Sequence, residues 1–482
     1  MRSVRPGLVV DELPNNAMEP AARELTLARR GSSLTVDRLS ALAVGGRQVL
    51  KTEELIMRAW GVLLTTFLGL WVPADAAAQV TAVRFSLLLP MRGSPIRDAV
   101  VVIEGDRIRT VGQGDETVPP GALVIDLRPL VGLPGLIDVH THMSLYWDHA
   151  PGTTPWSRLS SFSTPVLVFL AQENAKRTLE AGVTTVRDLG AGNYADIALR
   201  DLINRNAIVG PRMFVAGPGL HITDSPTRLG ITRADPGQAD GVAGVVAAAR
   251  QQLANGVDWI KMFGSTGSDQ DVTGFQTFTI EEMRAGVAVA HQAGKRIAIH
   301  SYGPNGARDA VAAGADSVEH ATDMDNATIA AMARGHVYYV PTVDHNRYYV
   351  DHRQEFGYGD QVVQRLNDYR QRNLATLRNA VQAGVPIAMG SDAVFTGFGE
   401  NARELEAFIQ AGMSTEAALR CATVNGAELL GLENEIGAIA PGFYADLIAV
   451  DGNPLDEISA VSRRTSWVMK GGVVVVDRRR SK

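Results

Sequence analysis

The sequence predicts an α/β protein, in which a (β/α)₈ TIM barrel carries a small discontinuous β-sandwich domain formed by both ends of the chain. Three observations support this prediction. Helical segments alternate with short apolar β-branched segments through the middle of the chain. Eight predicted strands fit within about 260 residues, which is the usual size of such a barrel. Alternating segments with turn signals lie on both sides of this region.

A repeated pattern marks most of the predicted barrel strands. A helical segment ends at or near Gly, a short apolar segment follows, and a polar residue closes it. The copies are LEAGVTTVRD (179–188), LANGVDWIKM (253–262), HQAGKRIAIH (291–300), VAAGADSVEH (311–320), MARGHVYYVPT (332–342) and VQAGVPIAMGSD (381–392). Gly suits the left-handed position that ends a helix, and four to six apolar residues suit a strand buried on both faces. GLIDVHTH (135–142) and RMFVAGPGLH (212–221) complete the set of eight.

The segments outside the predicted barrel indicate a second domain. AVVVIEGDRIRTVGQG, near the start, and GAIAPGFYADLIAVDGNP with SWVMKGGVVVV, near the end, favour antiparallel hairpins. We predict that residues 79–133 and 434–482 pair into the β-sandwich domain, and that residues 134–433 form the barrel.

The first 78 residues differ from the rest. Residues 1–56 carry many charges, and their apolar residues recur with neither a helical nor a strand period. We predict that they are an upstream extension outside the native protein. A positive start at Met57, a short apolar run and a small-residue stretch are typical of a signal peptide over residues 57–78. The apolar run is too short for a stable membrane span, which needs about 20 residues. The alternative to a signal peptide is a buried helix. We therefore expect an exported, periplasmic or secreted protein, which mass spectrometry of the native protein tests.

The composition narrows the function classes. A formal net charge of -6 over 482 residues argues against a nucleic-acid partner and allows a small-molecule substrate. The single cysteine, Cys421, excludes an intrachain disulfide and a thiolate metal cluster. The apolar content permits a homo-oligomer without specifying one.

Polar side chains close the predicted strands, and the carboxyl ends of barrel strands are where active sites lie. These residues are His140, His142, Lys261, His300, His320 and Asp392. Imidazole and carboxylate ligands suit Zn²⁺, with Mn²⁺, Co²⁺ or Fe²⁺ as alternatives. Each residue alone has an ordinary explanation, such as a core histidine or a helix N-cap. The six together predict a metal site.

Lys261 closes a buried strand, where an unpaired ammonium is costly. A neutral amine there would react with carbon dioxide to form a carbamate, an anionic ligand able to bridge two cations. The alternative is a lysine paired with an acidic neighbour. Two metals would lower the pKa of a bridging hydroxide and aim it at a carbonyl carbon, and Asp392 would accept its proton and pass it to the leaving amine.

These motifs resemble the amidohydrolase superfamily, over roughly residues 81–478. PGLIDVHTH, Lys261, His300, His320, SDA at 391–393 and the tail APGFYADLIAVDGNPLD carry the resemblance. VTTVRDLGA, WIKMFGSTG, IAIHSYG and DSVEHATDMD are similar to prolidase-like dipeptidases and ochratoxinase-type amidases. The resemblance implies one metal on His140, His142 and Asp392, a second on His300 and His320, and a bridge by carbamylated Lys261.

Several other residues are candidates for substrate contacts. His221 takes the place of the histidine in a Gly-Gly-His motif of the family, although the loop here is GPGLHITDSP. Tyr302 is a candidate oxyanion donor, with a packed tyrosine as the alternative. Arg347, in the predicted loop with His345 after the seventh strand, would bind a substrate carboxylate or line the rim. We expect Arg187 to pair with its neighbour Asp188.

The favoured function is hydrolysis of the amide bond of a dipeptide or N-acyl amino acid, as the resemblance implies. Hydrolysis of a cyclic amide, an imidazolone or a lactone is the alternative, because the same hydroxide attacks any activated carbonyl. A metal- or ligand-binding protein without turnover is a third hypothesis, since a fold does not prove a function.

Overall fold

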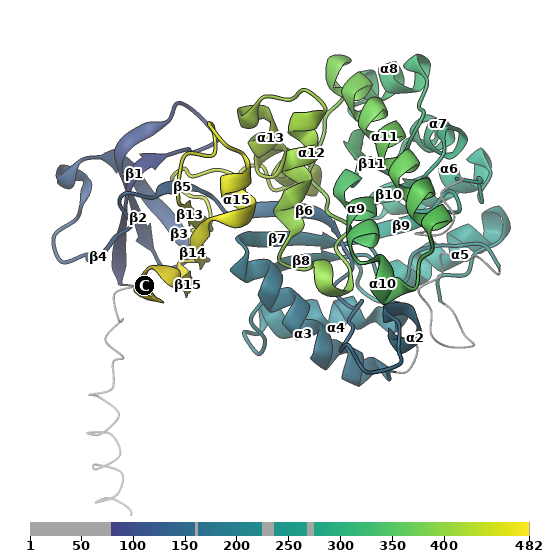
Figure 1. The fold of residues 1–482 in the computed structure, drawn as a ribbon, viewed down its shortest axis with the longest axis horizontal. Helices are drawn as coiled ribbons and strands as arrows, with labels where there is room; N and C mark the ends of the chain where they lie inside the picture. The colour runs from purple at the N-terminus through teal and green to yellow at the C-terminus, as the bar shows by residue number, and fades with distance from the viewer. Residues whose placement is uncertain (1–78, 160–161, 224–235, 268–273, 482) are drawn as a thin grey trace, which may run out of the picture. The chain divides into compact units, whose positions relative to one another are not determined.

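The computed structural model describes residues 79–159, 162–223, 236–267 and 274–481 (Figure 1). The predicted extension at 1–56 and the predicted signal peptide at 57–78 lie outside these residues. Among the helices described, none is both long and apolar enough to cross a membrane.

Both ends of the described chain contribute to one eight-stranded sheet. Its strands follow the order β15-β14-β13-β5-β1-β2-β3, and β4 also pairs with β1. The strands are β1 (Val80–Leu88), β2 (Ile96–Glu104), β3 (Arg107–Gln113), β4 (Leu123–Asp126), β5 (Val131–Pro134), β13 (Leu447–Val450), β14 (Thr465–Lys470) and β15 (Val473–Asp477). The antiparallel pairing of β5 with β13 joins the early strands to the late ones.

The hydrogen bonds connect these strands into a single sheet, whereas a sandwich has two. The reason lies in β1, which is nine residues long. Its first half pairs with β4 through Thr81–Arg84, and its second half pairs with β5 through Leu87 and Leu88. One long strand thereby belongs to both parts of the sheet.

The middle of the chain contains two sheets whose strands are all parallel. One has the order β6-β7-β8 and the other β12-β11-β10-β9. Their strands are β6 (Leu136–Thr141), β7 (Val183–Asp188), β8 (Arg212–Val215), β9 (Trp259–Phe263), β10 (Arg296–Ser301), β11 (Ser317–His320) and β12 (Tyr338–Val340). Isolated parallel bridges extend the pairing from Leu220 to Met262 and from Tyr339 to Ile387. The α/β class is therefore confirmed, together with seven of the eight predicted strands.

The eighth predicted strand, within 381–392, is present only as the bridge at Ile387. Its backbone still pairs on both sides, because Ala388 donates to Tyr339 O and Val139 donates to Met389 O. Asp392 has a φ of 52°, in the left-handed region. This conformation interrupts the extended backbone and turns the Asp392 side chain into the site described below.

Helices follow or precede the parallel strands. They are α2 (Pro155–Leu159), α3 (Thr164–Glu180), α4 (Ala195–Asn204), α5 (Gly241–Ala254), α6 (Ile280–Gln292), α7 (Pro304–Ala313), α8 (Asn326–Gly335), α9 (Val343–Asp351), α10 (Arg353–Phe356), α11 (Asp360–Gln382), α12 (Glu404–Gln410), α13 (Thr415–Cys421), α14 (Val424–Leu430) and α15 (Ser459–Arg463). Gly182 and Gly294 have positive φ after α3 and α6, as predicted. After α8 the left-handed residue is His336, with a φ of 53°, and not the predicted Gly335.

Gly390 lies where the backbone of the 387–393 segment passes between β12 and β6. A Cβ atom at this position would be 2.4 Å from Val340 Cγ1 and 2.7 Å from His140 Cβ. We expect Gly390→Ala to lower the free energy of unfolding by about 1–3 kcal/mol, because an overpacked interior forces its neighbours apart. Urea unfolding measures this change. Gly359→Ala is the control, since no atom lies within 4 Å of its added Cβ. Equal stability of the two variants would contradict the prediction.

Candidate metal centre

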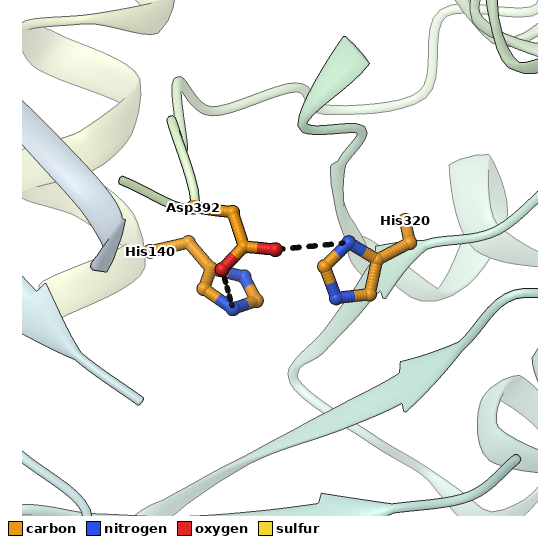
Figure 2. Close-up of side chains that lie close together, drawn as sticks. All are labelled: His140, His320 and Asp392. Carbon is orange, nitrogen blue, oxygen red and sulfur yellow. Dashed lines mark ion pairs between the residues drawn. The ribbon is translucent and has the colours of Figure 1, made fainter. Parts of the chain in front are cut away.

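Three of the predicted ligands meet directly. Figure 2 shows the Asp392 carboxylate between the imidazoles of His140, on β6, and His320, on β11. Asp392 Oδ1 is 3.6 Å from His140 Nε2, and Oδ2 is 3.9 Å from His320 Nδ1. One ligand atom from each residue lies within 4.8 Å of the others, and all three side chains are buried.

The remaining predicted ligands border this group. His142 Nε2 is 3.3 Å from Asp392 Oδ1. The ring centroids of His300 and His320 are 4.5 Å apart. Lys261, on β9, is 1% exposed, and its charge acts on the pKa values of His140 and His300. The strand ends therefore bring the side chains into one buried cluster.

Several nitrogen atoms in the cluster lack a hydrogen-bond partner. They are His140 Nε2, His300 Nε2 and Lys261 Nζ, all of them buried. A buried polar atom without a partner is costly, so native proteins seldom leave three of them together. Nitrogen and carboxylate donors in such a group fit a divalent cation of the zinc type.

The second ring nitrogens of three histidines are already engaged. His142 Nδ1 is 3.0 Å from Gly190 O, and because a carbonyl only accepts, Nδ1 carries a proton and Nε2 is the nitrogen that faces Asp392. His140 Nδ1 is 2.8 Å from Glu319 Oε2, and His320 Nδ1 is 2.7 Å from Thr342 Oγ1. Such contacts orient imidazoles for metal binding.

The charge states in the cluster also favour metal binding. Burial lowers the pKa of His140 to about 4 and that of Lys261 to about 8. Burial lowers the pKa values of His300 and His320 well below the ordinary value. Burial raises the pKa of Asp392, but neighbouring imidazoles outweigh this effect and hold it well below its usual range. His140, His300 and His320 are thus neutral and Asp392 is anionic. Burial acts on His142 in the same direction, but the contact with the Asp392 carboxylate outweighs it, so the pKa of His142 is raised instead.

Asp138 ties the segment that bears Asp392 to β6. Its carboxylate accepts hydrogen bonds from Ser391 N at 3.0 Å, Ser391 Oγ at 2.5 Å and Asn401 Nδ2 at 2.8 Å. It also accepts from the backbone N of His140 at 3.1 Å. The backbone on both sides of the His140–Asp392 contact is therefore held by one buried side chain.

Tyr302, the predicted oxyanion donor, is a buried neighbour of the cluster. Its ring stacks on His320 with centroids 4.9 Å apart and an angle of 8° between the planes. It also meets His300 edge-on at 4.9 Å. Tyr302 therefore lies beside two of the predicted metal ligands.

The two predicted substrate residues are placed differently. His221 follows Leu220, whose backbone N donates to Lys261 O on β9, and its own Nδ1 is 2.9 Å from Ile222 O. Arg347 lines a small cavity that also includes Asp392. Its guanidinium forms ion pairs with three carboxylates, those of Asp344 at 2.6 Å, Glu400 at 3.4 Å and Asp351.

One expected pairing is wrong. Arg187 does not pair with its sequence neighbour Asp188; its Nη2 donates to Glu319 Oε1 at 2.9 Å. Asp188 instead accepts from Met143 N and Thr141 Oγ1. The reason is strand geometry, because consecutive residues of a strand point to opposite faces.

His345 was predicted in the loop with Arg347, at the substrate side of the site, and not among the metal ligands. Its Nε2 is 3.3 Å from Asp392 Oδ2, on the side of the carboxylate opposite His140 and His142. The segment expected as a loop is helix α9, and the buried Glu404 carboxylate accepts hydrogen bonds from its first two backbone N–H groups. The only signal in the sequence was a histidine shortly after a predicted strand end.

Parallel βα units with imidazoles and a carboxylate at the carboxyl ends of the strands define a class of protein, the metal-dependent hydrolases. The model of the amidohydrolase family matches residues 131–475, and the chain belongs to this family. It is accordingly a hydrolase that acts on carbon–nitrogen bonds.

Known proteins agree with this assignment. The chain is 29% identical to ochratoxinase from Aspergillus niger over 82% of its own length and 86% of the relative. It is 27% identical to an imidazolonepropionase from Streptomyces avermitilis over 74% and 81% of the two chains. A solved Xaa-Pro dipeptidase with bound methionine superposes with a TM-score of 0.74 and 30% identity, covering 82% of this chain and 99% of that one. The resemblance to prolidase-like and ochratoxinase-type members is confirmed.

Proposed function

We propose that the protein is a binuclear metal-dependent amidohydrolase that cleaves the amide bond of a dipeptide or an N-acyl amino acid. The observation that carries the proposal is the group of buried nitrogens without a hydrogen-bond partner beside the Asp392 carboxylate. The similarity to an ochratoxinase and to a Xaa-Pro dipeptidase supports the substrate class.

The residues divide between two cation sites. His140, His142 and Asp392 would hold one cation, and His300 and His320 the other. Lys261, converted to a carbamate, would bridge them, and its pKa of about 8 provides the free amine that this conversion needs. When bound, the cations supply Lewis acidity and lower the pKa of a water molecule.

The chain's own groups then perform proton transfer and substrate positioning. Asp392, ionised in this cluster, accepts a proton from the attacking water and returns it to the leaving amine. The Tyr302 hydroxyl donates to the carbonyl oxygen as negative charge develops there. His221 and Arg347 contact the part of the substrate distant from the scissile bond.

We place these residues on a closed (β/α)₈ barrel over residues 134–433. The parallel bridges from Leu220 to Met262, from Tyr339 to Ile387 and from Thr141 to Ala393 support this closure. Segments 79–133 and 434–482 then form the second domain, in agreement with the pairing of β5 and β13.

The test combines metal content and hydrolysis. The protein is purified with Zn²⁺ and bicarbonate, its metal is measured by plasma emission, and dipeptides and N-acyl amino acids are screened for release of an amino acid. We expect about two metals per chain and release of the amino acid. A chelator should abolish activity, and metal with bicarbonate should restore it, because metal ions supply several kcal/mol of charge stabilisation. Absence of bound metal would refute the proposal.

A second candidate is hydrolysis of a cyclic amide or imidazolone at the same site. The similarity to an imidazolonepropionase favours it. Two metals per chain, no amino acid released from any linear substrate, and ring opening of an imidazolone would select this candidate.

A further inference from the structure

We propose that Glu319, held by Arg187 and Ser317, is a positioning residue that fixes the His140 imidazole for metal binding. The inference rests on the metal site of the proposed function and assigns a role to residues outside the ligand set. Its basis is a buried hydrogen-bond network that crosses from β7 to β11 and ends on His140.

The two carboxylate oxygens of Glu319 have different partners. Oε1 accepts from Arg187 Nη2 at 2.9 Å and from Ser317 Oγ at 2.5 Å. Oε2 is 2.8 Å from His140 Nδ1. With its proton on Nδ1, His140 presents the lone pair of Nε2, which has no hydrogen-bond partner and faces Asp392 Oδ1 at 3.6 Å. Glu319 therefore selects the tautomer that a cation requires.

Arg187 is held as firmly as the carboxylate that it neutralises. Its Nε donates to Val139 O at 2.5 Å, and its Nη1 donates to Ser317 Oγ at 2.9 Å. The guanidinium carbon lies 4.4 Å from the ring centre of Trp259. Val139 directly precedes His140, so Arg187 holds the backbone of β6 as well as the carboxylate behind the imidazole.

A purely space-filling role does not account for this arrangement. Arg187 and Glu319 are both fully buried, and apolar side chains usually replace such a pair with little loss of stability. The other two engaged histidines have neutral partners at Nδ1, a carbonyl for His142 and a hydroxyl for His320. A carboxylate partner makes an imidazole a more basic ligand, and among the three Nδ1 atoms only that of His140 lies within hydrogen-bond distance of a carboxylate.

The test compares metal affinity with the stability of the metal-free protein in the full chain. Zn²⁺ affinity is measured by competition with a chromophoric chelator, and stability by urea unfolding. We expect Glu319→Gln to weaken Zn²⁺ binding by about 10–100-fold, the usual effect of removing such a partner. The double variant with Glu319→Gln and Arg187→Met also removes the guanidinium that the single variant leaves without a carboxylate. It should therefore regain stability toward urea, relative to the single variant, without regaining Zn²⁺ affinity. If the single variant fails to fold, this double variant provides the measurement.

Asp316→Asn is the matched control, because Asp316 Oδ2 is 2.9 Å from His291 Nε2 in another histidine–carboxylate pair, just before β11. It should leave Zn²⁺ affinity within about twofold of the wild type, since His291 is no part of the ligand set. Wild-type affinity in the double variant, or an equal loss in Asp316→Asn, would overturn the inference. Wild-type protein that binds no Zn²⁺ would overturn the proposed function and this inference together.

Discussion

Replacing Asp392 by Asn is expected to lower the turnover number for amide hydrolysis by about 10²–10⁴-fold while most of the metal stays bound. The Asn side chain keeps an oxygen that can face the same histidines, but it cannot accept the proton of the attacking water. His142 and His345 flank the carboxylate at 3.3 Å each, so both imidazoles still border the Asn side chain after the substitution. Steady-state kinetics and plasma emission on the same sample measure the two effects.

Asp446→Asn provides the control for this variant. Asp446 is as buried as Asp392, but it accepts hydrogen bonds from Arg212 Nη1 at 2.6 Å and Gly471 N at 2.8 Å, in contact with strands β8 and β14. Its loss should affect stability and leave the turnover number per folded chain near that of the wild type. Wild-type turnover by the Asp392→Asn protein would eliminate Asp392 as the proton acceptor. A matching loss of metal and activity would restrict Asp392 to the role of a ligand.

Replacing Lys261 by Met should reduce metal content from about two per chain to one or fewer and lower turnover by about 10²–10⁴-fold. The side chains are similar in length, but a thioether forms no carbamate. Losing a cation removes several kcal/mol of charge stabilisation, and each 1.36 kcal/mol corresponds to a factor of ten. Lys470→Met is the control, because burial also lowers the pKa of Lys470 to about 8, yet its Nζ donates to Gly210 O in another part of the molecule.

The pH dependence of metal loading tests the carbamate directly. Only the neutral amine reacts with carbon dioxide, and the folded-state pKa of Lys261 is about 8. The free-amine fraction rises about tenfold per pH unit below this value and levels off above it. Reconstitution of metal-free protein with Zn²⁺ at a constant concentration of dissolved carbon dioxide should therefore accelerate with pH up to about 8. A loading rate independent of bicarbonate would contradict the bridge.

Much of the candidate site was predictable because the predicted metal ligands follow the period of the strands. His140 and His142 alternate along β6 and its end, and His300 and His320 lie at or near the ends of β10 and β11. The structure brings these residues together with Asp392, as predicted. The last strand was predicted less well. Asp392 has positive φ, and local hydrophobicity does not reveal that the extended backbone stops before it.

The sequence by itself determined the α/β class, the positions of seven strands and the residue types that meet at their ends. These features depend on local patterns, which are the spacing of apolar residues and the polar residue that closes each strand. Only the tertiary structure decided that Glu319 faces His140, that Arg187 pairs with Glu319 and that His345 lies beside Asp392. These contacts join residues from separate strands and helices, and their geometry depends on how those elements pack, which no local pattern encodes.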